Sequence, residues 1–439
     1  MDNPSRALPR RFWPRLSIRG LMILVLVLGG GIGWVAQRAK IQRDAVRGIS
    51  AAGGVRYNWQ YVSEKYDPKA SPPGPKWLRD IVGPDLLDTV VLANLLGPDV
   101  DDRVMSHVGA LPGVERFNLQ GKTSPSLTAA GMARIGQLPR LQQFWVQGMT
   151  DPSGFLPYLF DKPRLRSIWL QAAAVTDGDL ARLARLTRLE ELLLNGRNVT
   201  DAGFAHLANL KSLRWLDLPG CHVGDLSALS GLKDLERIDL HTNTRVSPRH
   251  DQSTPVDLGP LHNLSKLTIL SLSPLPVDDA GLAQIKDLPQ LQSLDVAGPG
   301  ITEAGLAHIA SMPRVLSIVL RNTSIRNLGT LAPLMSRLIN CWLDGSPIAD
   351  DGVWPLAGAS ALRRLSLRET KLTDVGLKHL AGLNGLTFLD LSATRVGDTG
   401  MRELAGLSGL QTLNLRGTLV SEAGAASLQT RLPGLRILR

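Results

Sequence analysis

A leucine-rich pattern recurs about every 24 residues from position 86 to the end of the chain, at a period typical of repeat proteins. The pattern is L-x-x-L-x-L, in which other apolar residues replace some leucines. It begins fifteen times, and eight of the fourteen intervals between starts are identical in length. The starts are Leu87, Val114, Leu141, Leu165, Leu189, Leu213, Leu235, Leu267, Leu291, Val315, Leu338, Leu362, Leu386, Leu410 and Leu435. Such a period returns a short strand to the same place in every unit, so that stacked units bury their apolar faces against one another. We therefore expect a solenoid of parallel strands.

A glycine recurs ten residues before many strand starts, within a motif that resembles T-D-x-G-L. Thr200-Asp201-Ala202-Gly203 and Thr373-Asp374-Val375-Gly376 are two examples. A Thr or Asp side chain ahead of a Leu-periodic stretch favours a helix N-terminus, because its oxygen accepts a free backbone N–H. Each repeat is therefore expected to contain a strand, a turn and a short helix.

Segments 372–394 and 396–418 resemble the leucine-rich repeats of the RNase-inhibitor-like and F-box-adaptor-like type. With the N-terminal segments described below, the whole arrangement is similar to bacterial membrane-anchored leucine-rich-repeat proteins. The resemblance covers residues 86–439, about 15 units. It implies an α/β fold, a curved horseshoe with parallel strands on the concave face and short helices on the convex face. For function it implies protein binding, with no catalytic residue and no cofactor.

The N-terminal region contains one long apolar segment. Residues 20–37 carry no charge and would span about 27 Å as a helix at ~1.5 Å per residue, which is just enough to cross a bilayer. Trp13 and Trp34 lie near its two ends, where membrane proteins concentrate aromatic residues. We expect a single transmembrane signal anchor. A cleaved signal peptide is the alternative, although no A-x-A site follows.

Four segments are predicted. They are an Arg-rich cytoplasmic leader (1–19), the transmembrane helix (20–37), a juxtamembrane segment and N-terminal cap (38–85), and the leucine-rich-repeat domain (86–439). Five arginines precede the apolar segment and four basic residues follow it, so the positive-inside rule places the N-terminus in the cytoplasm by a small margin. The repeats are then extracytoplasmic.

The net charge of +10 is concentrated at the N-terminus. Residues 1–47 hold nine basic and two acidic residues, which leaves 40 basic against 37 acidic residues in the rest of the chain. A duplex-binding domain needs its basic excess on the folded body, so the sequence argues against a nucleic-acid partner. The charge instead flanks the segment that is expected to contact the lipid bilayer.

Histidine and cysteine spacing argues against a metal site. His107, His206, His308 and His379 all occupy one repeat position, seven residues before a strand start. The two cysteines, Cys221 and Cys341, also fall at repeat positions and have no motif partner. Since the familiar enzyme motifs are also missing from the sequence, we expect no metal, no cofactor and no enzyme activity.

The residue between the last two apolar positions of each strand points out of the concave sheet. This rule predicts a row of large apolar side chains in three successive units, with a fourth at the neighbouring position of the next unit and a charged border beyond. The predicted partner-binding residues are Trp145, Trp169, Leu193, Trp215, Asp217, Arg237, Asp239 and His241. Large residues that merely fill a tightly curved face are the alternative. A second, more polar surface consists of Arg321, Trp342, Asp344, Arg364, Arg368, Phe388 and Asp390.

Two functions fit these features. The first is a membrane-tethered scaffold that recognises a protein partner through the concave face. The alternative is a substrate-recognition adaptor of a protein-modifying or degradation complex, which would need a docking domain ahead of the repeats. Only about 50 residues separate the apolar segment from the repeats, and they show no helical-bundle pattern. The first function is therefore favoured.

The interval from Leu235 to Leu267 is the longest between two strand starts, and its polar excess near 246–255 predicts a loop at one edge.

Overall fold

The computed structural model describes residues 18–62, 65–67, 70, 77, 88–122, 124–241 and 254–439. The chain divides into two compact units. The N-terminal unit contains Met1–Glu115 and Ser124–Pro139, and the solenoid unit contains Arg116–Thr123 and Arg140–Arg439. Most of the predicted leader and of the predicted 246–255 loop lies outside the described residues.

The N-terminal unit is built on one long helix and an antiparallel strand pair. Its elements are α1 (Ile18–Ile49), β1 (Gly53–Tyr57), the 3-10 helix η1 (Asn58–Gln60), β2 (Tyr61–Val62), β3 (Lys65–Tyr66), β4 (Val90–Leu96), α4 (Asp102–Gly109), α5 (Ala129–Met132) and η2 (Ala133–Gln137). Strand β1 pairs antiparallel with β4, the strand of the first repeat. The segment before the repeats thus extends the sheet at the strand of the first repeat. Strand β1 ends at Tyr57, and the 3-10 helix η1 follows it directly.

Helix α1 runs past both ends of the predicted apolar segment. Its C-terminal half packs on the rest of the N-terminal unit through Ala39, Gln42, Ala45 and Ile49, which are all buried. Within the described part of the chain, no helix combines the length and apolarity that a membrane crossing requires.

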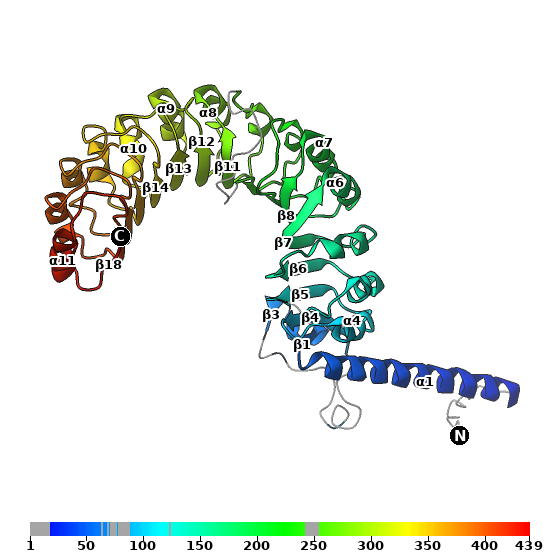
Figure 1. Cartoon of the computed structure of the whole chain (residues 1–439). Coiled ribbons are helices and arrows are strands. Elements are labelled where there is room, and N and C mark those ends of the chain that lie inside the picture. The colour runs from blue at the N-terminus through cyan, green and yellow to red at the C-terminus, as the bar shows by residue number, and fades with distance from the viewer. Residues whose placement is uncertain are drawn as a thin grey trace, which may run out of the picture. The chain divides into compact units, whose positions relative to one another are not determined.

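In the solenoid unit the strands lie side by side along the inner side of an arc, and the helices lie on its outer side (Figure 1). The strands are β5 (Arg116–Gln120), β6 (Gln143–Gln147), β7 (Ser167–Thr176), β8 (Glu191–Asn198), β9 (Trp215–Asp217), β10 (Arg237–Asp239), β11 (Ile269–Pro276), β12 (Ser293–Ala297), β13 (Ser317–Arg321), β14 (Asn340–Trp342), β15 (Arg364–Ser366), β16 (Phe388–Asp390), β17 (Thr412–Asn414) and β18 (Arg436–Leu438). Each pairs in parallel with the strands of the neighbouring repeats. This arrangement confirms the predicted sheet.

The outer side combines short α-helices with 3-10 turns. The α-helices are α6 (Asp177–Leu183), α7 (Asp201–Phe204), α8 (Asp279–Ile285), α9 (Glu303–Ser311), α10 (Ala332–Met335) and α11 (Glu422–Arg431). The 3-10 helices are η3 (Ser153–Tyr158), η4 (Ala205–Asn209), η5 (Ser227–Leu229), η6 (Gly259–Leu261), η7 (Gly329–Leu331), η8 (Trp354–Gly358), η9 (Gly376–His379) and η10 (Gly400–Gly406). Several repeats thus replace the expected helix by a 3-10 turn, which advances further per residue and spans the outer side with few residues.

The repeat leucines form the core. Leu365, Leu389 and Leu413 follow one another in neighbouring strands and are completely buried. Since each lies between the equivalent leucines of adjacent repeats, the core is a continuous column along the solenoid.

The T-D-x-G motif connects repeats as well as starting helices. Thr302 caps α9 by accepting the Ala304 N–H, as predicted. Its own N–H and hydroxyl donate to the carboxylate of Asp279 in the preceding repeat. A Cβ atom added at Gly305 would lie 2.2 Å from Asp279 Oδ1, so this position accepts only glycine without a shift of its neighbours.

Candidate binding surface on the concave face

Two parallel rows of side chains point out of the sheet of the solenoid unit. The first row contains Gln143, Ser167, Glu191, Trp215 and Arg237, which are matched in register across β6 to β10. The second row, two residues further along each strand, contains Trp145, Trp169, Leu193, Asp217 and Asp239. The intervening residues, such as Phe144 and Leu216, are buried in the core. The side chains of both rows therefore alternate with core residues along each strand.

Three tryptophans on these rows form one aromatic stack. The Trp145 and Trp169 rings lie almost parallel, with centroids 4.6 Å apart. Trp215 meets Trp169 edge to face at 5.0 Å. Although Trp215 lies in the other row, its ring reaches across, so that the three indoles make one surface. We call Trp145, Trp169 and Trp215 the tryptophan stack.

Two polar residues hold the stack in place. The Trp145 Nε1–H donates to Ser167 Oγ at 2.8 Å, and the Trp169 Nε1–H donates to Glu191 Oε2 at 3.0 Å. The Ser167 hydroxyl in turn donates to the same Glu191 oxygen at 2.7 Å. The sequence reasoning missed Ser167 and Glu191. Their position two residues before Trp169 and Leu193, on the same outward side of a strand, was the available signal.

The tryptophans are only partly exposed. Trp145, Trp169, Leu193 and Trp215 are all half-buried, because the rings cover one another and the neighbouring strands. The outer edges of a rigid stack are what remains accessible.

The charged border lies beside the stack, on β9 and β10. The Arg237 guanidinium lies over the Trp215 ring, 5.0 Å from its centroid. Arg237 also pairs with Asp239 at 2.8 Å, and His241 contacts the other oxygen of the same carboxylate. Asp239 is only 4% exposed. It is buried by the two groups that it binds.

Asp217 and Asp239 stand opposite each other on adjacent strands. Burial raises the pKa of Asp217 to about 6, and the nearby charge of Asp239 adds to this effect against the opposing influence of Arg237 and His241. Burial would also raise the pKa of Asp239, but the hydrogen bond and charge of His241, together with Arg237, lower it instead. The pair therefore shares its negative charge unequally, and Asp239 remains the ionised member.

Two donors beside the stack are buried and unsatisfied. Within the described part of the chain, neither Trp215 Nε1 nor Arg237 Nε has a hydrogen-bond partner. Buried donors without acceptors are uncommon and cost free energy, so these two donors distinguish the end of the tryptophan stack from the rest of the concave face.

The second predicted surface also contains an aromatic pair. Trp342 and Phe388 stack with centroids 6.0 Å apart and line a depression of about 270 Å³ together with Arg364, Thr387, Gln411 and Thr412. Nearby, Arg321 binds Asp295, and Asp344 accepts a hydrogen bond from Ser366. Arg368 pairs with Glu369, and Asp390 accepts the Asn414 amide at 2.8 Å. Arg321 and Arg368 are therefore ion-paired within the chain, whereas Asp344 and Asp390 accept hydrogen bonds from neutral side chains.

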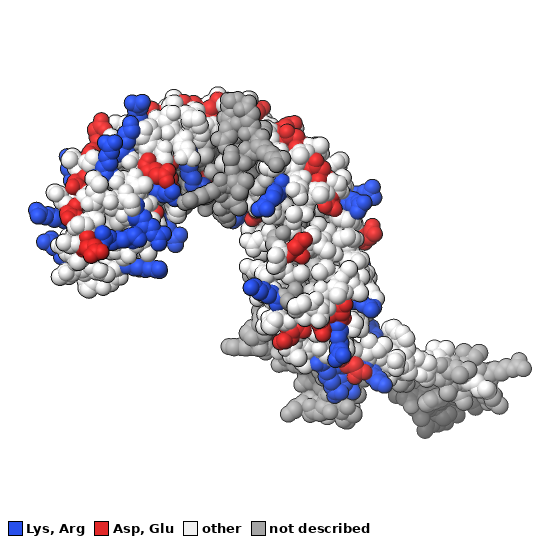
Figure 2. Space-filling model, viewed as in Figure 1, with Lys and Arg blue, Asp and Glu red and all other residues white. Residues whose placement is uncertain are grey.

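The geometry favours neither a reactive cysteine nor a metal site among the described residues. Cys221 and Cys341 are both buried, and burial raises the pKa of each thiol to about 12. Such thiols are poor nucleophiles at neutral pH. No group of three or more His, Cys, Asp or Glu residues suited to a metal ion occurs among the residues that the structure describes. Basic and acidic side chains are interspersed over the face of the solenoid unit shown in Figure 2.

No protein-family model matches the sequence, and no curated protein matches it. Among solved structures, an internalin from Listeria monocytogenes is 23% identical, with a TM-score of 0.52 over 76% of this chain and 88% of that one. A leucine-rich-repeat protein of Leptospira interrogans is 17% identical, with a TM-score of 0.47 over 78% of this chain and 93% of that one. The internalin match supports the fold alone, a leucine-rich-repeat solenoid with its parallel strands in one sheet. The predicted RNase-inhibitor-like or F-box-adaptor-like type has no support from these neighbours.

Proposed function

We propose that this chain is a membrane-tethered recognition scaffold, which binds a protein partner through the concave face of its solenoid and catalyses no reaction. The observation that carries the proposal is the tryptophan stack. Aromatic side chains that are rigid and partly exposed give large contact area at a small cost in conformational entropy, and Trp is enriched among the residues that dominate binding energy.

The border of the stack adds polar specificity. Trp215 Nε1 and Arg237 Nε are buried and lack acceptors within the described part of the chain, so this polar position lies directly beside the stack. Arg237 is already fixed by Asp239 and the Trp215 ring, so it presents its charge in a defined direction. An apolar centre with a polar rim is the usual anatomy of a protein interface.

The proposed tether is the uncharged segment 20–37, which lies within α1. Met22, Val27, Trp34 and Val35 on this part of the helix are exposed in the isolated chain. Apolar side chains without a protein partner favour a lipid environment, and an aromatic residue near the end of the segment suits the membrane interface. The repeats are then extracytoplasmic, in keeping with the slight excess of arginine before the segment.

No observation favours the adaptor alternative. Between α1 and β4 the named elements of the described residues are β1, η1, β2 and β3.

Cross-linking of the full-length chain in membranes of its native host tests the recognition role. The wild type, Trp169→Ala and the convex-side variant Arg402→Ala are captured and their partners identified by mass spectrometry. A protein enriched with the wild type and with Arg402→Ala, but lost with Trp169→Ala, supports the proposal. A partner that all three variants retain equally rules out the stack as its contact. Resistance of the full-length chain to carbonate extraction tests the tether separately.

A further inference from the structure

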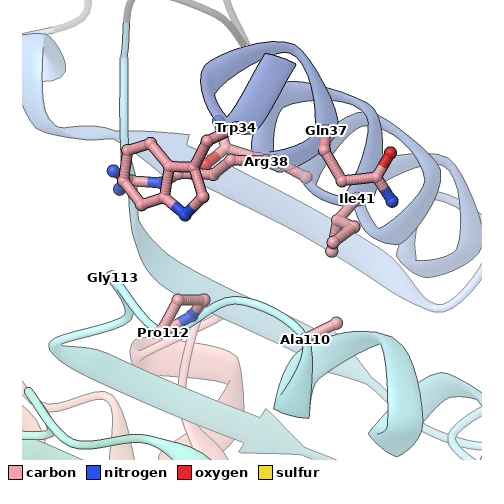
Figure 3. Close-up of a pocket in the computed structure, with 8 residues that line it drawn as sticks. Trp34, Gln37, Arg38, Ile41, Ala110, Pro112 and Gly113 are labelled. Atoms are coloured by element: carbon pink, nitrogen blue, oxygen red, sulfur yellow. The ribbon is translucent and has the colours of Figure 1, made fainter. Parts of the chain in front are cut away.

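A groove in the N-terminal unit lies at the C-terminal end of the proposed membrane segment. It has a volume of about 420 Å³, within the range of small-molecule sites. One wall is α1, and the other is the turn that follows α4 (Figure 3). Its lining residues are Trp34, Gln37, Arg38, Ile41, Gln42, Ala110, Pro112 and Gly113.

The helical wall presents apolar and polar side chains on the same face of α1. Trp34, Gln37, Arg38 and Ile41 are spaced three and four residues apart and therefore share one face of α1. Figure 3 shows Trp34 and Ile41 directed toward Pro112 and Ala110 across the groove. Trp34 is 65% exposed and Ile41 is 44% exposed, so the groove carries apolar surface that the protein leaves uncovered.

Arg38 supplies the positive charge of this groove. Its guanidinium lies 5.8 Å from the centroid of the Trp34 ring and donates one long hydrogen bond, 3.5 Å, to Thr89 Oγ1. Among the residues that the structure describes, no carboxylate lies within ion-pair distance of Arg38. A guanidinium held over an aromatic ring, with its charge uncompensated, is suited to bind a phosphate through paired N–H donors.

The depth of the groove in a bilayer follows from the sequence. Arg38 is the first charged residue after the uncharged segment 20–37, and Ile41 lies only about 6 Å further along the helix axis at ~1.5 Å per residue. The headgroup layer on each side of the hydrocarbon core is about 5–8 Å thick. Trp34 is thus at the hydrocarbon boundary and Arg38 within the headgroup layer.

We propose that this groove binds one anionic phospholipid of the surrounding membrane, whose phosphate pairs with Arg38 while the upper part of an acyl chain covers Trp34 and Ile41. The proposal rests on the membrane tether proposed above. Charge complementarity and the position of the groove at headgroup depth select a phospholipid over a second copy of the chain, because a copy would have to bring its own Arg38 against an uncompensated like charge.

Native mass spectrometry of the full-length chain tests the site. The protein is released from detergent micelles that contain equal amounts of phosphatidylglycerol and phosphatidylcholine. The wild type is expected to retain phosphatidylglycerol in about tenfold excess. Arg38→Gln should lose this preference, and Ala110→Trp should lose the bound lipid by filling the groove while Arg38 is still present. Arg47→Gln, a matched change on the same helix outside the groove, should keep both.

Three results would overturn the proposal. One is equal retention of the two lipids by the wild type, and another is an equal loss of preference in Arg38→Gln and Arg47→Gln. The third is a dimer that disappears in Ala110→Trp, since it would assign the groove to a second copy. Circular dichroism of each variant confirms that the fold is intact. If carbonate extraction at high pH releases the full-length chain from membranes, the proposed tether is wrong. The groove is then tested by measuring whether the chain still prefers phosphatidylglycerol to phosphatidylcholine when both are supplied as soluble short-chain lipids.

Discussion

Asp279 accepts two hydrogen bonds from Thr302 of the next repeat, one from the backbone N–H at 2.8 Å and one from the hydroxyl at 2.6 Å. The same pair of contacts recurs at several places along the convex edge, as a ladder that joins some repeats to the next. Its other complete rungs are Asp102–Thr128, Asp177–Thr200, Asp350–Thr373 and Asp398–Ser421. Asp102, Asp177 and Asp279 are also the first residues of α4, α6 and α8, so each of them stabilises both its own repeat and the following one.

Loss of one rung should therefore lower the stability of the whole solenoid unit. Asp279→Ala removes two charge-assisted hydrogen bonds and is expected to cost about 1–3 kcal/mol of unfolding free energy. Asp287→Ala, an exposed carboxylate in the same repeat, is the matched control and should cost less than about 0.5 kcal/mol. Urea denaturation of both variants measures the difference. Equal effects would mean that the ladder contributes nothing beyond surface charge.

A second prediction concerns the turn that follows each strand. Asn322, Gly345, Glu369, Ala393 and Gly417 occupy the same repeat position and all have positive φ angles, between 52° and 70°. A side chain is strained in this conformation, whereas glycine adopts it freely. Ala393→Gly should stabilise the protein by about 0.5–1 kcal/mol, and Gly417→Ala should destabilise it by a similar amount. Thermal unfolding that moves in the same direction for both changes would contradict this explanation.

The core register makes a third prediction. Leu389 is fully buried between Leu365 and Leu413, so Leu389→Ala opens a void between neighbouring repeats and should cost about 2–5 kcal/mol. Lys378 lies exposed on the outer side, and Lys378→Ala should cost little. Comparable losses of unfolding free energy, measured by chemical denaturation, would mean that the inward and outward positions are assigned incorrectly.

The acidic pair on the concave face makes a fourth prediction. Because burial raises the pKa of Asp217 from 3.8 to about 6, the folded chain binds this proton more tightly than the unfolded chain does. The contribution of Asp217 to stability should therefore decrease as pH rises from about 4 to 6, by about 1–2 kcal/mol when partial solvent screening is allowed for. Asp217→Asn should match the wild type near pH 4 and exceed it at pH 7.5. Melting temperatures measured across this range decide the point, and a constant difference at all pH values would refute it.

The sequence was sufficient for the solenoid but not for the details of its surface. Apolar periodicity determines which leucines are buried, because a shifted register would expose an entire row. The pattern could not show that Asp279 bonds Thr302, since the motif alone explains each residue as part of a helix N-terminus. Their separation by approximately one repeat, which recurs along the chain, was the unused signal. Burial of Asp239 was also missed, because it depends on Arg237 and His241 closing over its carboxylate.

The tryptophan stack is the strongest test of the proposed function, because its geometry separates stability from binding. Trp145 contributes a stacked ring and one hydrogen bond, so Trp145→Ala should cost about 1–2 kcal/mol of stability, which a leucine-rich core tolerates. Once the partner is identified, its affinity for the folded variant should fall by about 2 kcal/mol or more, as expected at the centre of an interface. Arg364→Ala and Arg368→Ala should have smaller effects that diminish with added salt. Titration calorimetry below the melting temperature of every variant measures these affinities. If Trp145→Ala lowers the melting temperature while affinity remains intact, the stack only fills the curved face. The depression beside Trp342 and Phe388 is then the next surface to test.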